Sequence, residues 1–200
     1  AMIRRDPDAV VLLLVRHGRT EANARGIFCG RSDVRLDAEG RAQAARLTPL
    51  RGRVDRVCAS PLRRAQDTAR AVGGPETLPG IVEIDQGIVE GMTVADAVAA
   101  HPEVAAWWSP ESDAFTFPGG ENLRQVEARV TAALHALARD CAPGEVALVV
   151  GHQAAFAAFA CRALGLPLGQ WRDVCLKNAH GRVARYAGGR FRLDPGVWSP

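Results

Sequence analysis

The strongest constraint on the fold is a pair of continuous apolar runs, each followed by a histidine. Val10–Val15 leads into Arg16-His17-Gly18, and the run from Glu145 to Val150 leads into Gly151-His152. A continuous apolar run bounded by polar residues is typical of a strand buried on both faces, as in a parallel sheet covered by helices. The two runs therefore predict a largely parallel sheet with a histidine at the carboxyl end of two strands.

The segments around these runs alternate between helical and extended patterns. Helices are predicted from Asp37 to about Leu47, from Ser60-Pro61 with the serine as N-cap, over 121–138 and over 154–164. Shorter extended pieces are predicted at 54–59, 82–84 and 174–176, with a hairpin over 183–193. The alternation predicts an α/β fold, a three-layer α/β/α sandwich with a mostly parallel central sheet, one antiparallel edge strand and a small helical cap. The 200 residues suit a single domain, 1–200, with the cap or insert around 88–118.

Composition narrows the class of protein. A net charge of +3 with scattered arginines argues against nucleic acid as the partner. The five cysteines are odd in number and widely spaced, so neither a disulfide framework nor a zinc ribbon is expected. No apolar run is long enough to span a membrane, and Ala1-Met2 resembles a remnant of expression. We expect a cytoplasmic protein without a membrane partner; whether it is a monomer or a homodimer is left open.

Polar residues should gather at one edge of the predicted sheet. Ligands of open α/β sheets bind outside the carboxyl ends of the strands. Arg16 and His17 end one strand, His152 ends another, and a third ends at Ser60 and leads into Arg64. Glu83, in the extended piece 82–84, can join them, so the sequence predicts two histidines, two arginines and a carboxylate at one place.

This set of residues favours a phosphate group over a metal ion. Two histidines and a glutamate can ligate zinc, but two guanidinium groups at the same place make a cation costly. Guanidinium groups instead bind phosphate oxygens in pairs. Phosphoryl transfer needs a nucleophile, neutralised oxygens and a proton for the leaving group, which His17, the basic residues and Glu83 can supply. No metal and no cofactor are predicted.

With these residues in order, the chain resembles the histidine phosphatase superfamily, also called phosphoglycerate mutase-like, over nearly its whole length. The resemblance lies in six motifs: Arg16-His17-Gly18-x-Thr20 with Asn23; Gly30 to Gln43-Ala44; Ser60-Pro61-Leu62-x-Arg64-Ala65; Glu83 with Gly87 and Glu90-Gly91; Pro118-Gly119-Gly120-Glu121 with Arg129; and Gly151-His152. It implies that His17 carries the phosphoryl group as phosphohistidine. It further implies that Arg16, Asn23, Arg64 and His152 hold the phosphate, and that Glu83 is the general acid and then the base.

The short chain resembles the phosphatase branch, including α-ribazole phosphatases and broad-specificity phosphatases. The implied function is a metal-independent phosphatase that hydrolyses a small phosphorylated metabolite, a phosphomonoester, through a phosphohistidine intermediate. Two alternatives stay open, a phosphomutase of the phosphoglycerate mutase type and a non-catalytic phosphoester-binding protein.

Departures from the family pattern concern the substrate rim. Gln153 stands where small residues are usual after the second histidine, and Val89 replaces a frequent tryptophan before Glu90-Gly91. We expect Gln153, Arg31 and His180 to lie at the rim, and Val89 to alter it. Arg129 is expected on a solvated helix face, paired with Glu121.

Overall fold

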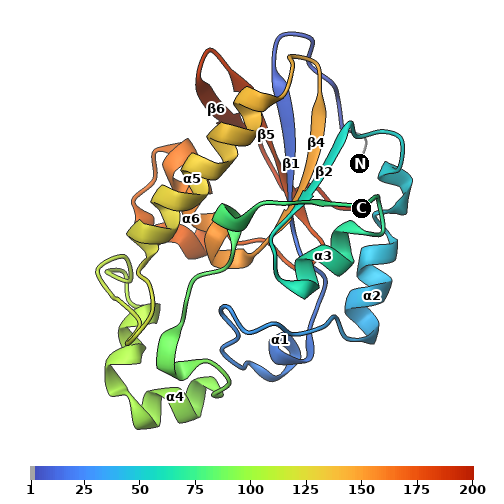
Figure 1. The fold of residues 1–200 in the computed structure, drawn as a ribbon. Coiled ribbons are helices and arrows are strands. Elements are labelled where there is room, and N and C mark those ends of the chain that lie inside the picture. The colour runs from blue at the N-terminus through green and yellow to red at the C-terminus, as the bar shows by residue number, and fades with distance from the viewer. Residues whose placement is uncertain (1–2) are drawn as a thin grey trace.

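A computed structural model describes residues 3–200, so the Ala1-Met2 pair expected to be an expression remnant lies outside the described residues. These residues form a six-stranded sheet in the order β3-β2-β4-β1-β5-β6 (Figure 1). The strands are β1 (Val10–Arg16), β2 (Arg56–Ala59), β3 (Glu76–Thr77), β4 (Val146–Gly151), β5 (Gly181–Ala187) and β6 (Arg190–Leu193). The first four are parallel, and β5 and β6 form an antiparallel hairpin. The mostly parallel sheet with an antiparallel edge is confirmed, and the predicted hairpin forms that edge.

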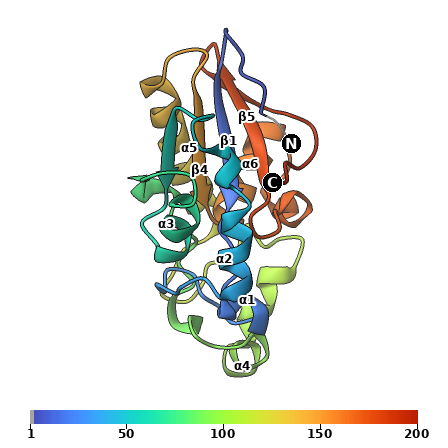
Figure 2. The same cartoon turned by 90° about the vertical axis from the view of Figure 1, so that its right-hand side faces the viewer.

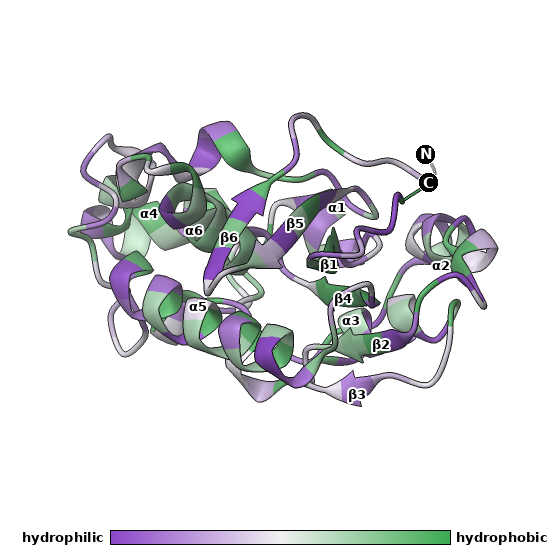
Figure 3. Cartoon of the chain, turned by 90° about the horizontal axis from the view of Figure 1, so that it is seen from above, coloured by the Kyte–Doolittle hydropathy of each residue, from purple (hydrophilic) through white to green (hydrophobic). Residues whose placement is uncertain are grey.

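Helices cover both faces of the sheet, which completes the predicted three layers. They are α1 (Glu21–Arg25), α2 (Ala38–Ala45), α3 (Arg63–Ala69), α4 (Val94–Ala100), α5 (Leu123–Asp140) and α6 (Gln153–Leu164). Helices α5 and α6 lie on one face and α2 and α3 on the other (Figure 1). Seen from above, β1 and β4 are hydrophobic and the outer strands β3 and β6 are hydrophilic (Figure 3). None of the helices within residues 3–200 is long and apolar enough to cross a bilayer.

The central strand β1 is buried on both faces, as its continuous apolar run predicts. Leu12 and Leu14 pack into the core beneath α5 and α6, and Leu13 and Val15 pack into a second core with Ala65 of α3. Successive side chains of a strand point to opposite faces, so both cores hold the same strand. Each core fixes the position of β1 along its neighbours, because a shift of one residue would exchange the two faces.

Two predicted strands are absent, and two helices, α3 and α5, begin two residues later than predicted. Val82–Ile84 follows the 3-10 turn Pro79–Ile81, and Val174 ends the 3-10 helix Leu168–Val174. Apolar side chains of both segments pack into the α5–α6 core, but the backbone of these segments does not join the sheet. A short apolar run in the sequence does not distinguish a buried strand from a buried irregular segment. The helix expected to be capped by Ser60 starts at Arg63 with Leu62 as N-cap.

The register of β1 on β4 places the two histidines side by side. Arg16 is opposite Gly151 in the parallel ladder, and the His17 amide donates to the Gly151 carbonyl at 3.0 Å. On the other side of β4, the Ser60 amide donates to the Val150 carbonyl at 3.0 Å. The predicted gathering of strand ends therefore follows from the hydrogen bonding of three adjacent strands.

The helical cap lies beyond the carboxyl ends of the strands. Helix α4 and the 3-10 helix Pro102–Trp108 form it, and α4 and α1 occupy this end of the molecule in both side views (Figures 1 and 2). Ring centroids of Trp107 lie 4.9 Å from Phe117 and 4.7 Å from Trp171. Trp107 of the cap therefore packs against Phe117 and against Trp171.

Close backbone contact after β1 leads to a first prediction. A methyl group on Gly18 would lie 2.5 Å from the Gly40 carbonyl oxygen, and main-chain atoms there cannot move aside cheaply. We expect Gly18→Ala to lower the free energy of unfolding by about 1–3 kcal/mol, measured by urea denaturation. The control is Gly74→Ala, whose methyl group meets nothing within 4 Å. Equal stability of the two variants would contradict the steric argument.

Candidate functional site

His17 is buried at the end of β1 in a defined tautomer. Its side chain is 4% exposed, and Nδ1 lies 2.7 Å from the Gly18 carbonyl oxygen. A carbonyl oxygen only accepts, so Nδ1 carries the proton and Nε2 has the lone pair of a neutral ring. Burial lowers the pKa of His17 well below its ordinary value, and the charges of Arg64 and Arg16 lower it further. The structure thus keeps His17 neutral with Nε2 unprotonated.

His152 lies beside His17 and is fully buried. The two ring centroids are 5.2 Å apart, and His152 Nε2 is 2.7 Å from the Ser60 hydroxyl. That hydroxyl accepts from the Leu62 amide at 3.4 Å, so its own proton can be donated to Nε2. The proton of a neutral His152 is then on Nδ1, a buried atom without a hydrogen-bond partner in the structure. Burial, followed by the charge of Arg64, lowers the pKa of His152 as well.

The two site arginines are held by main-chain carbonyl groups. Arg64 is 2% exposed and donates from Nη1 to Ser32 and from Nη2 to Gly30, both at 2.7 Å. Arg16 donates from Nη1 to the Leu176 carbonyl at 2.8 Å, while its buried Nε has no partner in the structure. Carbonyl oxygens orient a guanidinium group without cancelling its charge. Both arginines can therefore attract an anion.

Glu90, which belongs to the same predicted motif as Glu83, has a supporting position. Its Oε1 accepts from the Arg31 amide at 2.7 Å and its Oε2 from the Ser32 amide at 2.8 Å. These bonds fix the loop whose carbonyl groups hold Arg64. Gly30 in this loop has a φ of 35°, and a methyl group there would lie 2.0 Å from Glu90 Oε1, so the packing requires glycine.

Glu83 faces the start of α6. Its Oε1 accepts from the amides of Ile84 at 2.9 Å and Ala155 at 3.0 Å, and its Oε2 accepts from the Ala154 amide at 3.2 Å. Two of these donors are main-chain amides in the first turn of α6, which have no partner within the helix. The three hydrogen bonds fix the carboxyl group beside the histidines. Oε2 makes a single long contact, so it is the oxygen with capacity for a further partner.

Arg129 holds the segment that carries Glu83. The prediction of a solvated Arg129 is wrong, because its guanidinium group donates to the carbonyl groups of Gly80, Val82 and Glu83 at 2.6–3.0 Å. The predicted pair with Glu121 is confirmed, at 2.9 Å. Burial alone would raise the pKa of Glu121, but hydrogen bonds and charge from Arg129 lower it. These contacts join residues 46–49 positions apart, so no local sequence pattern predicts them.

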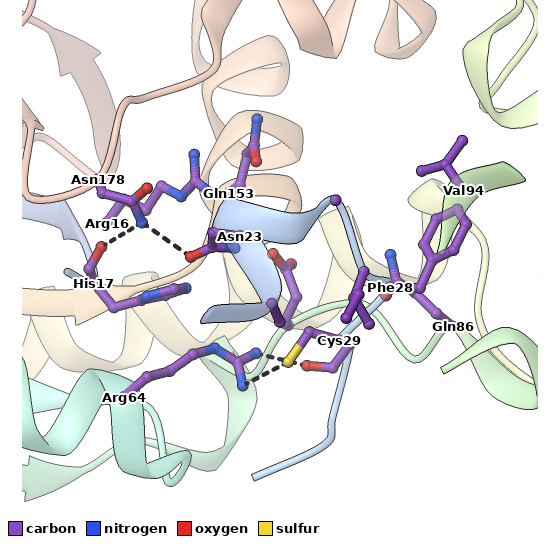
Figure 4. Close-up of a pocket in the computed structure, with 15 residues that line it drawn as sticks. Arg16, His17, Asn23, Phe28, Cys29, Arg64, Gln86, Val94, Gln153 and Asn178 are labelled. Atoms are coloured by element: carbon purple, nitrogen blue, oxygen red, sulfur yellow. Dashed lines mark hydrogen bonds between the residues drawn. The ribbon is translucent and has the colours of Figure 1, made fainter. Parts of the chain in front are cut away.

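Six of the predicted site residues line one cavity of about 420 Å³ (Figure 4). Its lining includes Arg16, His17, Asn23, Arg64, Glu83 and Gln153. His152 is buried next to His17, and Arg31 and His180 are not among the lining residues. Arg31 instead pairs with Glu121 at 3.1 Å, and His180 Nδ1 lies 2.9 Å from the Asn178 carbonyl. Val89, expected to alter the rim, is fully buried because its side chain packs into the core.

Asn178 is a lining residue that the sequence did not single out. Its Nδ2 donates to the His17 carbonyl at 2.9 Å and to Asn23 Oδ1 at 3.3 Å (Figure 4). Asn23 Oδ1 also accepts from the Thr20 amide, so its amide nitrogen is the group left for a ligand. The next residue, Ala179, has a φ of 58°, which a non-glycine residue adopts at a cost. Within residues 3–200 no group of three His, Cys, Asp or Glu side chains is placed to hold a metal ion.

The lowered pKa values of the two histidines predict acid sensitivity. An unfolded histidine titrates near 6.5, so the unfolded chain binds more protons than the native one below that pH. Above about pH 6.5 the two neutral imidazole rings make their full contribution to the free energy of unfolding. It falls as the pH drops through the lowered native values, by at most about 1.4 kcal/mol per pH unit for each histidine. Urea denaturation between pH 7.5 and 5.5 measures the slope, and His17→Asn should reduce it. An unchanged slope in that variant would contradict the assignment.

The comparisons with known proteins agree with this geometry. The family model described as histidine phosphatase superfamily (branch 1) matches residues 12–196. Phosphoserine phosphatase 1 of Hydrogenobacter thermophilus is 32% identical over 85% of this chain and 83% of its own length. A probable phosphoglycerate mutase of Enterobacter sp. is 31% identical over 82% of this chain and 80% of its own.

A solved structure shows the same fold. The putative α-ribazole-5′-phosphate phosphatase of Escherichia coli superposes on this chain with a TM-score of 0.83 and 26% sequence identity. The superposition covers 96% of this chain and 97% of the other. The mostly parallel sheet, the paired strand-end histidines and the family match over nearly the whole chain lead to one conclusion. The chain belongs to branch 1 of the histidine phosphatase superfamily.

Proposed function

We propose that the protein is a phosphatase that hydrolyses a small phosphomonoester through a phosphohistidine formed on Nε2 of His17. The observation that carries the proposal is a set of buried polar groups beside His17. Arg16 Nε and His152 Nδ1 are buried and have no hydrogen-bond partner in the structure, and the Arg64 guanidinium lines the cavity together with Arg16 and His17. Unpaired buried donors are costly, and an anion with several oxygens is the ligand that satisfies them together.

In the first step, the Nε2 lone pair of His17 attacks phosphorus and the bond to the ester oxygen breaks. The leaving oxygen takes a proton from Oε2 of Glu83, the oxygen that makes a single main-chain contact. The imidazole ring gains positive charge as the N–P bond forms. The Gly18 carbonyl, which accepts from Nδ1 at 2.7 Å, is oriented to stabilise that charge.

In the second step, water attacks phosphorus of the phosphohistidine and the N–P bond breaks. Glu83 accepts the proton of the water, and His17 returns to its neutral tautomer. Arg16 and Arg64 neutralise the phosphoryl oxygens through both steps, and His152 Nδ1 and the amide nitrogen of Asn23 donate hydrogen bonds to them. Preorganised cations and N–H donors supply the charge stabilisation that phosphoryl transfer requires, so the proposed reaction needs no metal ion.

Trapping the phosphoenzyme tests this proposal. We expect a quenched reaction with a ³²P-labelled phosphomonoester to give acid-labile, base-stable label on the wild-type chain and none on His17→Ala. The variant should lose at least about a thousandfold in kcat, because the nucleophile is absent. His135→Ala is the matched control, since His135 contacts Tyr186 and Phe191 instead of the cavity.

The same experiment separates the proposal from its alternatives. A hydrolase releases one inorganic phosphate per alcohol, whereas a mutase returns the label to a second substrate. A non-catalytic binder forms a complex without label transfer. Full turnover by His17→Ala would overturn the proposal.

The contacts of Arg129 predict a separate effect on the proton-transfer step. Arg129→Met removes one of the two arginines paired with Glu121 and leaves the carbonyl groups of Gly80 and Val82 without this donor, so we expect a loss of about 2–4 kcal/mol in stability. In the folded fraction kcat should fall about 10–100-fold, as expected when a general acid is displaced. Vanadate affinity should be unchanged, because Arg129 does not line the cavity. Arg124→Met, at an exposed position on the same helix, is the control. Weaker vanadate binding without loss of kcat would contradict this role.

A further inference from the structure

The cavity in front of His17 has a charged end and an uncharged end. Arg16, His17 and Arg64 lie together at one end, and Phe28, Gln86 and Val94 lie at the other (Figure 4). A volume of about 420 Å³ falls within the roughly 300–1,000 Å³ typical of small-molecule sites. The second end therefore has space for the part of the ester that leaves.

No side chain at the second end offers a charge to a ligand. Of the lining residues in the described chain, Arg16, Arg64 and Glu83 are the charged ones. All of these belong to the proposed phosphoryl-transfer chemistry. The lining residue Cys29 has a thiol whose pKa is raised by burial, so it stays neutral.

Two cations outside the lining, Arg31 and Arg172, are engaged elsewhere. Arg31 pairs with Glu121 and donates to the Glu83 carbonyl, so its charge is compensated. Arg172 lies over the Trp171 ring, with 4.1 Å from its guanidinium carbon to the ring centroid. A carboxylate on the leaving group would lose water without gaining a cation, and it would lie in the same cavity as Glu83.

Two features of this end suit an uncharged ligand. Gln86 Oε1 is buried and has no hydrogen-bond partner in the structure, so it can accept from a hydroxyl or N–H group. Phe28 is 6% exposed and is fixed by ring contacts with Phe117 and Trp108, both at 5.8 Å. It forms an apolar wall together with Ile27 and Val94.

From this geometry we infer the class of substrate for the phosphatase function proposed above, on which the inference rests. The leaving group is an uncharged alcohol that presents a hydroxyl or N–H donor to Gln86 and an apolar surface to Phe28. Phosphoesters whose leaving group carries a carboxylate are poor substrates. This separates the chain from its relative named for phosphoserine, a substrate with a carboxylate.

A matched pair of esters tests the inference. Glycerol 3-phosphate and 3-phosphoglycerate differ in one group, a hydroxymethyl in the first and a carboxylate in the second. We expect kcat/KM to be at least about tenfold higher for glycerol 3-phosphate, a difference of about 1.4 kcal/mol. Phenyl phosphate and 4-carboxyphenyl phosphate form a second pair, for which the same order is expected.

A charge placed at the uncharged end should weaken the preference for glycerol 3-phosphate over 3-phosphoglycerate. Gln86→Lys supplies the missing cation, so kcat/KM for 3-phosphoglycerate relative to glycerol 3-phosphate should rise about tenfold, the change expected from about 1.4 kcal/mol. Val94→Lys should act in the same direction from a position that is 39% exposed, where folding is not at risk. Gln170→Lys adds the same charge at an exposed position outside this cavity and should leave the ratio unchanged.

The outcomes distinguish this inference from the proposed function. Turnover of 3-phosphoglycerate or phosphoserine equal to that of glycerol 3-phosphate overturns the inference and leaves the phosphatase intact. A ratio unmoved by both Gln86→Lys and Val94→Lys also overturns it. No turnover of any ester, phenyl phosphate included, overturns the proposed function and the inference with it.

Discussion

The site depends on the register of β1 against β4. Pairing of Arg16 with Gly151 sets His17 next to His152, with ring centroids 5.2 Å apart. A slip of one residue would turn His17 to the other face of the sheet and exchange its two cores. Leu12 and Leu14 on one face and Leu13 on the other are fully or almost fully buried, so both cores resist that slip. The hydrophobic energy of the sheet thus maintains the geometry of a small polar site.

This arrangement concentrates positive charge at a buried site, which is energetically unfavourable. Burial and the two guanidinium groups keep both imidazole rings neutral, which leaves a lone pair on His17. Arg64 and Arg16 are oriented by the carbonyl groups of Gly30, Ser32 and Leu176, which have dipoles but no net charge. Glu90 is bound to loop amides, and Glu121 to Arg129 and Arg31. Pairing the carboxylates elsewhere keeps the site positive and ready for an anion.

The sequence predicted the parts of this site that depend on strand ends. His17, Arg64 and His152 follow strands, and parallel strands bring their carboxyl ends together. The sequence-based prediction was wrong where the local pattern of apolar and charged residues does not reflect the tertiary packing. Apolar residues at 82–84 and 174–176 resemble strands, yet they fill the core from irregular backbone, because burial alone does not require ladder hydrogen bonds. Arg129 has the spacing of a helix surface residue, and its partners come from a segment nearly fifty residues away.

The leaving-group end of the cavity shows why specificity is harder to predict than chemistry. Phosphoryl transfer uses a few residue types at positions set by the sheet, so they are visible as motifs. The opposite end is built from the loops around Phe28 and Gln86 and the start of α4, and its character depends on which charges are cancelled. Arg31 is a cation in the sequence, but in the fold it is paired with Glu121. The charge at this end of the cavity is therefore determined by tertiary ion pairs, which the sequence motifs do not contain.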